Sequence, residues 1–158
     1  MSMDVQNLSM VLPDESATEH LAQWLASCAR PGDVIALWGT LGTGKSTLAR
    51  AFIRALTSPE EEVPSPTFTL VQQYDSDAGL VWHFDLYRLE APEDALELDI
   101  EEAFAEGICL IEWPDRLGRY LPKQRLDVTL ETGDAGGERI MTLTAHGPWA
   151  DRLGDLTE

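Results

Sequence analysis

A glycine-rich segment that runs from Gly39 to Ser46 has the spacing GxxxxGK[ST] of a phosphate-binding loop. Its glycines let successive backbone N–H groups turn toward an anion, and the positive end of a following helix adds to the attraction. In such a loop Lys45 would reach the β- and γ-phosphates, Ser46 would hold Mg²⁺ and Thr47 would donate to the α-phosphate. The alternative is a glycine-rich turn that only caps a helix. The candidate phosphate-binding residues are Gly39, Thr40, Leu41, Gly42, Thr43, Gly44, Lys45, Ser46 and Thr47.

Two carboxylates follow apolar runs, as expected of acids at the ends of buried strands. The run VWHFD ends at Asp85 and the run ICLIE ends at Glu112. Either acid could ligate magnesium or orient the attacking water, and the sequence leaves this division open. The alternative for either is a solvated acid at the tip of a strand. We therefore take Lys45, Asp85 and Glu112 as candidate catalytic residues, and Ser46, Asp85 and Glu112 as candidate metal ligands.

The segment VPSPTFTL carries a further candidate, Thr67. Two prolines stiffen this loop, and in nucleotide-binding loops a threonine in such a segment can sense the γ-phosphate. The alternative is an ordinary entry into a strand. Trp113 directly follows Glu112, and it would either stack on a base or pack in the core.

Three other side chains are weaker candidates. His83 shares a strand face with Asp85, although a histidine packed in the core is the favoured interpretation. Arg88 and Arg116 lie near the candidate site in the sequence and could neutralise phosphate charge, but each is more typical of a surface ion pair.

The elements that must position these residues follow from hydrophobic periodicity. A capping-box pattern at Ser16–Glu19 precedes apolar residues at helical spacing. A continuous apolar run before the glycine loop and another before Glu112 are typical of strands buried on both faces. We expect helices over residues 16–28, 45–56, 92–104 and 114–121, and strands over 34–38, 67–74, 80–86, 107–112, 125–131 and 138–145.

This order predicts an α/β fold with a mixed sheet, helices on both faces and a C-terminal hairpin. The 158 residues fit one domain. We expect that domain to span residues 1–158, with residues 1–9 and 150–158 loosely ordered.

The charge balance argues against unaided binding to nucleic acid or membranes. The chain has 28 Asp plus Glu against 11 Lys plus Arg, a formal net charge of −17. Such a surface repels phosphate backbones and anionic lipid.

Cys28 and Cys109 have no metal-binding spacing and are expected to be reduced core residues, which suits the cytoplasm. The first residues do not have the pattern of a signal peptide.

Four motifs in order resemble the TsaE family, also called YjeE, a bacterial ATPase of tRNA modification. They are GTLGTGKST, SPTFTLVQQY, HFDLYRL and LIEWPDRLG, and the resemblance extends from about Thr18 to Gly118. The second and fourth motifs are more specific than the glycine loop. The resemblance implies a small P-loop ATPase fold with ATP and Mg²⁺ as cofactors.

The resemblance also implies an accessory role in forming N6-threonylcarbamoyladenosine at position 37 of tRNAs that read codons starting with A. The partners would be the TsaB and TsaD proteins, with TsaD performing the transfer and tRNA reached through the complex. Hydrolysis would reset the complex between turnovers, slowly in the isolated chain and faster with partners. The family positions map onto Lys45, Ser46 and Thr47 for phosphates and magnesium, Thr67 for the switch-like segment, Asp85 for the essential aspartate, and Glu112 with Trp113 for magnesium, hydrolysis and nucleotide contact.

Two positions depart from the family pattern. Thr40 stands where the family commonly has Asp, which removes a charge near the phosphates. Ser46 replaces a common Thr and keeps the hydroxyl. The preference for ATP over GTP rests on the resemblance, because no motif here distinguishes the bases. Two other functions remain open: a nucleotide-dependent switch in which hydrolysis is dispensable, and a small-molecule kinase.

Overall fold

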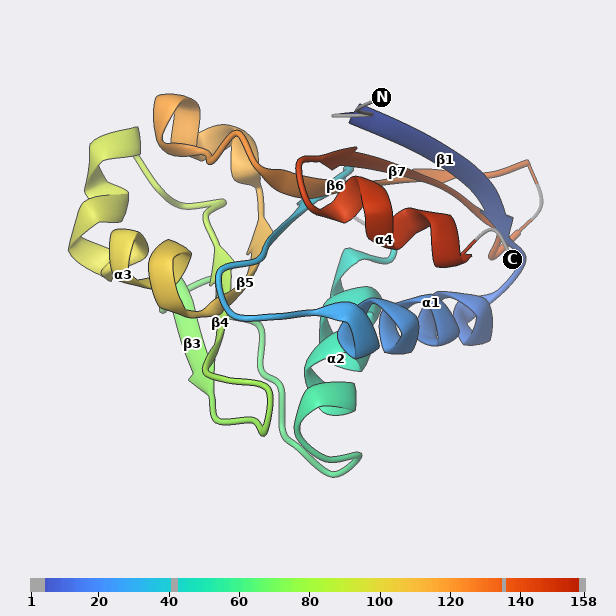
Figure 1. Ribbon diagram of the computed structural model, residues 1–158, viewed down its shortest axis with the longest axis horizontal. Coiled ribbons are helices and arrows are strands. Elements are labelled where there is room, and N and C mark those ends of the chain that lie inside the picture. The colour runs from blue at the N-terminus through green and yellow to red at the C-terminus, as the bar shows by residue number, and fades with distance from the viewer. Residues whose placement is uncertain (1–4, 41–42, 135, 157–158) are drawn as a thin grey trace.

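The computed structural model describes residues 5–40, 43–134 and 136–156, and in this part of the chain seven strands form one mixed sheet (Figure 1). The strands are β1 Val5–Leu12, β2 Val34–Trp38, β3 Val71–Tyr74, β4 Val81–Asp85, β5 Ile108–Glu112, β6 Arg125–Thr132 and β7 Arg139–His146. Their order across the sheet is β1-β7-β6-β2-β5-β4-β3. The central strands β6, β2, β5 and β4 are parallel, and β3, β7 and β1 pair antiparallel with their neighbours.

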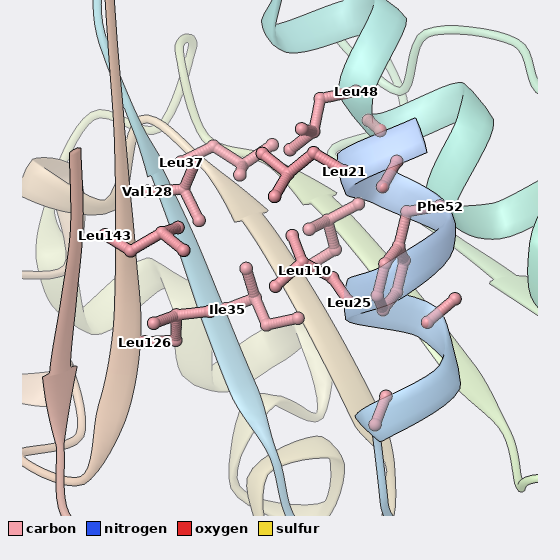
Figure 2. Packing of buried hydrophobic residues seen from close by; sticks show 14 of the residues in the cluster. Leu21, Leu25, Ile35, Leu37, Leu48, Phe52, Leu110, Leu126, Val128 and Leu143 are labelled. Atoms are coloured by element: carbon pink, nitrogen blue, oxygen red, sulfur yellow. The ribbon is translucent and has the colours of Figure 1, made fainter. Parts of the chain in front are cut away.

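Helices cover both faces of this sheet, which confirms the predicted α/β architecture. The elements are α1 Glu15–Cys28, α2 Lys45–Leu56, the 3₁₀ helix η1 Pro92–Leu98, α3 Ile100–Glu106, the 3₁₀ helix η2 Pro114–Tyr120 and α4 Trp149–Leu156. Buried residues of α1, α2 and α4 pack on one face, and those of η1, α3 and η2 pack on the other. Figure 2 shows the first of these cores, with Leu21 and Leu25 of α1 beside Phe52 of α2 and facing Ile35 and Leu110 of the sheet.

The register of the parallel strands brings the two candidate acids together. Asp85 and Glu112 are direct partners across β4 and β5. Leu110 of β5 packs in the core beneath α1 and α2, and side chains alternate along a strand. Glu112 therefore points to the same face as α2, and its cross-strand partner Asp85 does so as well.

The ends of the chain are more ordered than predicted. Residues 5–12 form an edge strand that pairs with β7 along its whole length, with Leu12 buried against the core. Residues 149–156 form α4, in which Trp149 and Leu153 are buried. The prediction of loose order was therefore wrong for these segments. Each end has an amphipathic pattern that is too short to be distinctive without its packing partner.

Three predicted boundaries also move. Helix α1 begins at Glu15, because Asp14 accepts a hydrogen bond from the Ala17 backbone at 2.9 Å in place of the expected capping box. The strand expected from residue 67 begins only at 71, since Leu70 has a left-handed φ of 71°. The helix expected over 92–104 is broken by Asp99 at a left-handed φ of 59°. Aspartate tolerates this conformation better than most residues.

Both cysteines are free thiols. Cys109 is fully buried and donates to the Ala103 carbonyl oxygen at 3.2 Å. Burial raises the pKa of the Cys109 thiol, and the nearby Asp33 carboxylate raises it further. This thiol is therefore protonated and inert. Within the described ranges, no helix has the length and apolar character needed to cross a membrane.

A mostly buried ion pair attaches α4 to the turn before β2. The Arg152 guanidinium donates to Asp33 Oδ2 at 2.6 Å and lies over the Trp149 ring. Replacing Arg152 with Met leaves the Asp33 carboxylate without its cation, and we expect a loss of about 3 kcal/mol in the free energy of unfolding. Urea denaturation measures the loss. The double variant Asp33→Asn with Arg152→Met should lose less, and an equal or larger loss would contradict this account.

Candidate active site

The glycine loop connects β2 to α2 at the carboxyl end of the parallel strands. Gly44 precedes the first helical residue with a left-handed φ of 99°, and within the described residues no side chain caps this helix start. Its first N–H groups are therefore available to an anion. At Gly39, a Cβ would lie 2.6 Å from the Leu130 carbonyl oxygen of β6, so the loop fits only with glycine there. Leu41 and Gly42 of the predicted phosphate set lie outside the described residues.

Lys45 is buried at the base of this loop, with only 5% of its surface exposed. Its Nζ donates to the Gly39 carbonyl oxygen at 2.7 Å and lies 4.0 Å from the centroid of the Trp113 ring. Burial lowers the pKa of Lys45, and the nearby Glu112, Asp85 and Asp115 carboxylates partly offset this by favouring the charged form. The ammonium thus lies between an aromatic face and a group of acids.

The two candidate acids differ in how their oxygens are held. Asp85 accepts the Thr67 hydroxyl at Oδ2 (2.9 Å) and the Tyr87 backbone N–H at Oδ1 (3.1 Å). Glu112 Oε2 lies 2.7 Å from Nε2 of His83, while Glu112 Oε1 makes no hydrogen bond to any described residue. Asp85 is therefore fixed at both oxygens, which keep further lone pairs for an ion, whereas Glu112 Oε1 is not engaged by any described residue.

These groups share one cavity of about 350 Å³. Thr40 does not line this cavity; it borders a neighbouring one of about 270 Å³, which shares Lys45 and Trp113 with the first. The structure thus brings the second half of the glycine loop, the switch-like threonine and both acids to one place. The lining residues are Gly44, Lys45, Ser46, Thr47, Ser65, Thr67, Asp85, Glu112, Trp113 and Arg139.

Residues 12–141 match the family model described as "Threonylcarbamoyl adenosine biosynthesis protein TsaE". This chain belongs to the TsaE family. A Bacillus subtilis relative named tRNA threonylcarbamoyladenosine biosynthesis protein TsaE is 38% identical over 138 residues, which cover 87% of this chain and 84% of the relative. A Rickettsia felis protein of the same name is 37% identical over 125 residues, covering 79% and 73%.

A solved structure supports the same assignment. The crystal structure of Bacillus subtilis YdiB superposes with a TM-score of 0.77 at 30% identity, covering 98% of this chain and 95% of that one. The predicted P-loop fold of the TsaE family is therefore confirmed.

The oxygen donors in the cavity of this TsaE-family chain suit Mg²⁺. A serine hydroxyl at Ser46 and the carboxylates of Asp85 and Glu112 are the hard ligands that this ion prefers. Across the described ranges, no group of three or more His, Cys, Asp and Glu side chains could hold a metal alone. The site therefore fits an ion that completes its coordination with water and phosphate oxygens.

Two residues in this site were missed or undervalued by the sequence analysis. Arg139 at the start of β7 donates from Nε to the Thr43 carbonyl oxygen at 3.1 Å and lines the cavity. Nothing in the sequence links it to a loop 96 positions away. The sequence favours a core position for His83; the side chain is indeed buried, but it also contacts Glu112 directly.

The two other arginine candidates lie outside the cavity. Arg88 packs over the ring of Phe68 at 4.3 Å, and Arg116 lies 5.8 Å from the centroid of Tyr87. Neither lines the space beside the glycine loop. Both arginines instead lie at the edge of the cavity, on a surface that they share with the exposed rings of Phe68 and Tyr87.

Proposed function

We propose that this TsaE-family chain binds ATP with Mg²⁺ and hydrolyses it as an accessory subunit in forming N6-threonylcarbamoyladenosine at position 37 of tRNA. TsaB and TsaD proteins are its proposed partners. One observation carries the hydrolytic part: a single cavity holds Lys45 of the glycine loop, the Ser46 hydroxyl and the acids Asp85 and Glu112. The pathway is supported by the names of the relatives.

The phosphates are proposed to lie at the start of α2, against its unpaired N–H groups. Lys45 would then leave the Gly39 carbonyl and the Trp113 ring for the β- and γ-phosphate oxygens. Ser46 and Asp85 would hold Mg²⁺, which neutralises charge on the phosphates when it is bound. The hydrogen bond from Thr67 to Asp85 supports a role for Thr67 in responding to a γ-phosphate.

Glu112 is the proposed water-orienting residue. A group in this role needs an oxygen that can accept from the attacking water. Glu112 Oε1 meets that need, because no described residue donates to it, whereas both oxygens of Asp85 already accept protein hydrogen bonds. Trp113 follows directly and would face the γ-phosphate side of the nucleotide, since its ring contacts Lys45.

The nucleoside is proposed to occupy a second cavity of about 240 Å³ that continues from the first. The two cavities share Gly44, Thr47 and Arg139, so a nucleotide could extend across both. Arg139 would then lie beside the phosphates and Thr47 beside the α-phosphate. The remaining lining residues of the second cavity are Pro13, Asp14, Glu15, Thr18, Gly136 and Gly137.

The surface at the cavity edge is our candidate contact site for the proposed partners. Phe68 is 80% exposed and Tyr87 is 44% exposed, next to the cavity residues Thr67 and Asp85. Exposed aromatic rings beside arginines are typical of protein interfaces. A net charge of −17 disfavours direct binding to tRNA, so tRNA would be reached through the partners. The free thiols suit a reducing compartment, and a cytoplasmic location is part of the proposal.

Phosphate release measured with and without purified TsaB and TsaD tests this function. We expect slow ATP hydrolysis by the isolated chain and at least about tenfold faster hydrolysis with the partners, because closure of a site by a partner can complete the set of catalytic groups around the nucleotide. Omitting the chain should abolish multiple-turnover formation of threonylcarbamoyladenosine. Absence of phosphate release under both conditions would overturn the proposal.

The kinase alternative makes a different prediction in the same assay. A kinase would transfer the γ-phosphate to an added acceptor and release little free phosphate. The chain offers no separate lid or acceptor-binding domain in its described residues, which favours hydrolysis. Labelled ATP incubated with candidate small-molecule acceptors distinguishes the two outcomes.

A further inference from the structure

A buried histidine contacts the proposed water-orienting acid. His83 lies on β4, two residues before Asp85, and only 2% of its surface is exposed. Its Nε2 is 2.7 Å from Glu112 Oε2 on the neighbouring strand β5. The parallel register of β4 and β5 places the two side chains on the same face of the sheet, with His83 opposite Leu110 and Glu112 two residues further along β5.

The contact with Glu112 indicates which tautomer this histidine adopts. An ionised carboxylate only accepts hydrogen bonds, so with Glu112 ionised the proton is on Nε2 of His83, and this N–H donates a hydrogen bond to Oε2. The other ring nitrogen, Nδ1, is buried and has no hydrogen-bond partner among the described residues. A buried polar atom without a partner costs stability. The fold therefore carries a penalty at this position.

Packing alone gives no reason for that penalty. The neighbouring β4 residues Val81, Trp82 and Phe84 are buried hydrophobic side chains, and another such residue would fill the His83 position without an unpaired nitrogen. The one polar contact that the ring makes is with Glu112. The contact with the Glu112 carboxylate is therefore the reason we infer for a histidine at position 83.

We propose that His83 is a positioning residue for Glu112. By donating to Oε2 it fixes the rotamer of the carboxylate and leaves Oε1 directed to the cavity, where the attacking water would lie. Partners of this kind orient active groups from behind, and their loss typically costs 10- to 100-fold in activity. The inference rests on the proposed function, because it assigns His83 a part in hydrolysis at the same site.

Two amide variants test the inference with matched chemistry. In His83→Gln the side-chain nitrogen occupies nearly the position of Nε2 and can still donate to Glu112. In His83→Asn the nitrogen reaches only the position of Nδ1 and cannot. We expect H83Q to keep most of the kcat of ATP hydrolysis, and H83N to lose about 10- to 100-fold in kcat with little change in the KM for ATP. Equal losses in both variants would overturn the inference.

A double variant separates positioning from general damage to the fold. In the Glu112→Gln background the acid no longer acts, so adding H83N should lower kcat no further. A full additional loss would mean that His83 acts through the fold and not through Glu112. Urea denaturation of each single variant shows whether the chain remains folded under assay conditions.

Crystal structures of H83Q and H83N give a readout that does not depend on hydrolysis. We expect the Glu112 side chain to keep its rotamer in H83Q and to change it in H83N. An unchanged rotamer in H83N would contradict the inference even if hydrolysis fell. If the unaltered chain hydrolyses no ATP with its partners, the proposed function fails, and these structures still decide whether His83 positions Glu112.

Discussion

Replacing Lys45 with Ala should lower kcat/KM for ATP hydrolysis by about 10²–10³-fold, the effect of removing a single preorganised charge-stabilising donor. Lys45 is buried between the Gly39 carbonyl oxygen and the Trp113 ring, at the base of the cavity that holds both acids. From there its ammonium can reach the γ-phosphate, where charge develops during transfer. Steady-state phosphate release and titration with a fluorescent ATP analogue measure the loss in turnover and in affinity.

The matched control is Lys123→Ala, because Lys123 is the only other lysine of the chain and is exposed. Near-normal turnover in K45A, or an equal loss in K123A, would contradict the site assignment. Lys45→Met is the stability control. Since burial is the largest effect on the pKa of Lys45 and lowers it, removing the charge relieves an unfavourable term, and the thermal midpoint should not fall.

The lowered pKa of Lys45 also gives the sign of two pH effects. Between that lowered pKa and the ordinary value of 10.5, the unfolded chain binds more protons at this lysine than the folded chain does. The contribution of Lys45 to the free energy of unfolding therefore rises with pH across this window. Below the window, the destabilisation caused by burying the charged amine is fully present. Nucleotide affinity changes in the opposite direction, because only the protonated amine attracts phosphate. As the pH is raised, nucleotide affinity in the unaltered chain should begin to fall at a pH lower than 10.5. K45M should lack this dependence.

The parts of the site that local sequence encodes were predictable. The glycine loop has a fixed spacing, and the apolar runs before Asp85 and Glu112 are long enough to indicate buried strands. Parallel pairing of β4 with β5 then places the two acids side by side. Spacing could not, however, assign different roles to the acids. Their proposed roles differ because Thr67 hydrogen-bonds to Asp85 and His83 to Glu112.

The parts that depend on topology were not predictable. Arg139 reaches the loop because β7 lies beside β6, which in turn pairs with β2. No local pattern encodes that arrangement. The same holds for β1, whose pairing with β7 joins the two ends of the chain. The Lys45–Trp113 contact also requires Trp113 at a left-handed φ of 58°, a conformation that is rare for a bulky side chain.

Glu112→Gln should lower kcat by about 10²–10⁴-fold, the range for loss of a general base, while ATP affinity remains close to normal. The amide has the same shape as the carboxylate, and its oxygen can still accept from Nε2 of His83. The change therefore removes the base without removing its support. Phosphate release and equilibrium ATP binding measure the two quantities. Glu131→Gln is the matched control, because Glu131 is an exposed acid on β6 and loses the same charge.

The same variant decides whether hydrolysis itself is needed. If hydrolysis resets a complex between turnovers, E112Q should support at most about one round of threonylcarbamoyladenosine formation per complex and then stop, because an enzyme whose release step is blocked accumulates in its bound state. If the chain is a switch that needs only bound nucleotide, E112Q should sustain modification at the normal rate although phosphate release is lost. Sustained modification would thus refute the ATPase role while keeping the nucleotide site, and a loss of ATP binding in E112Q would refute the placement of Glu112 as a water-orienting residue.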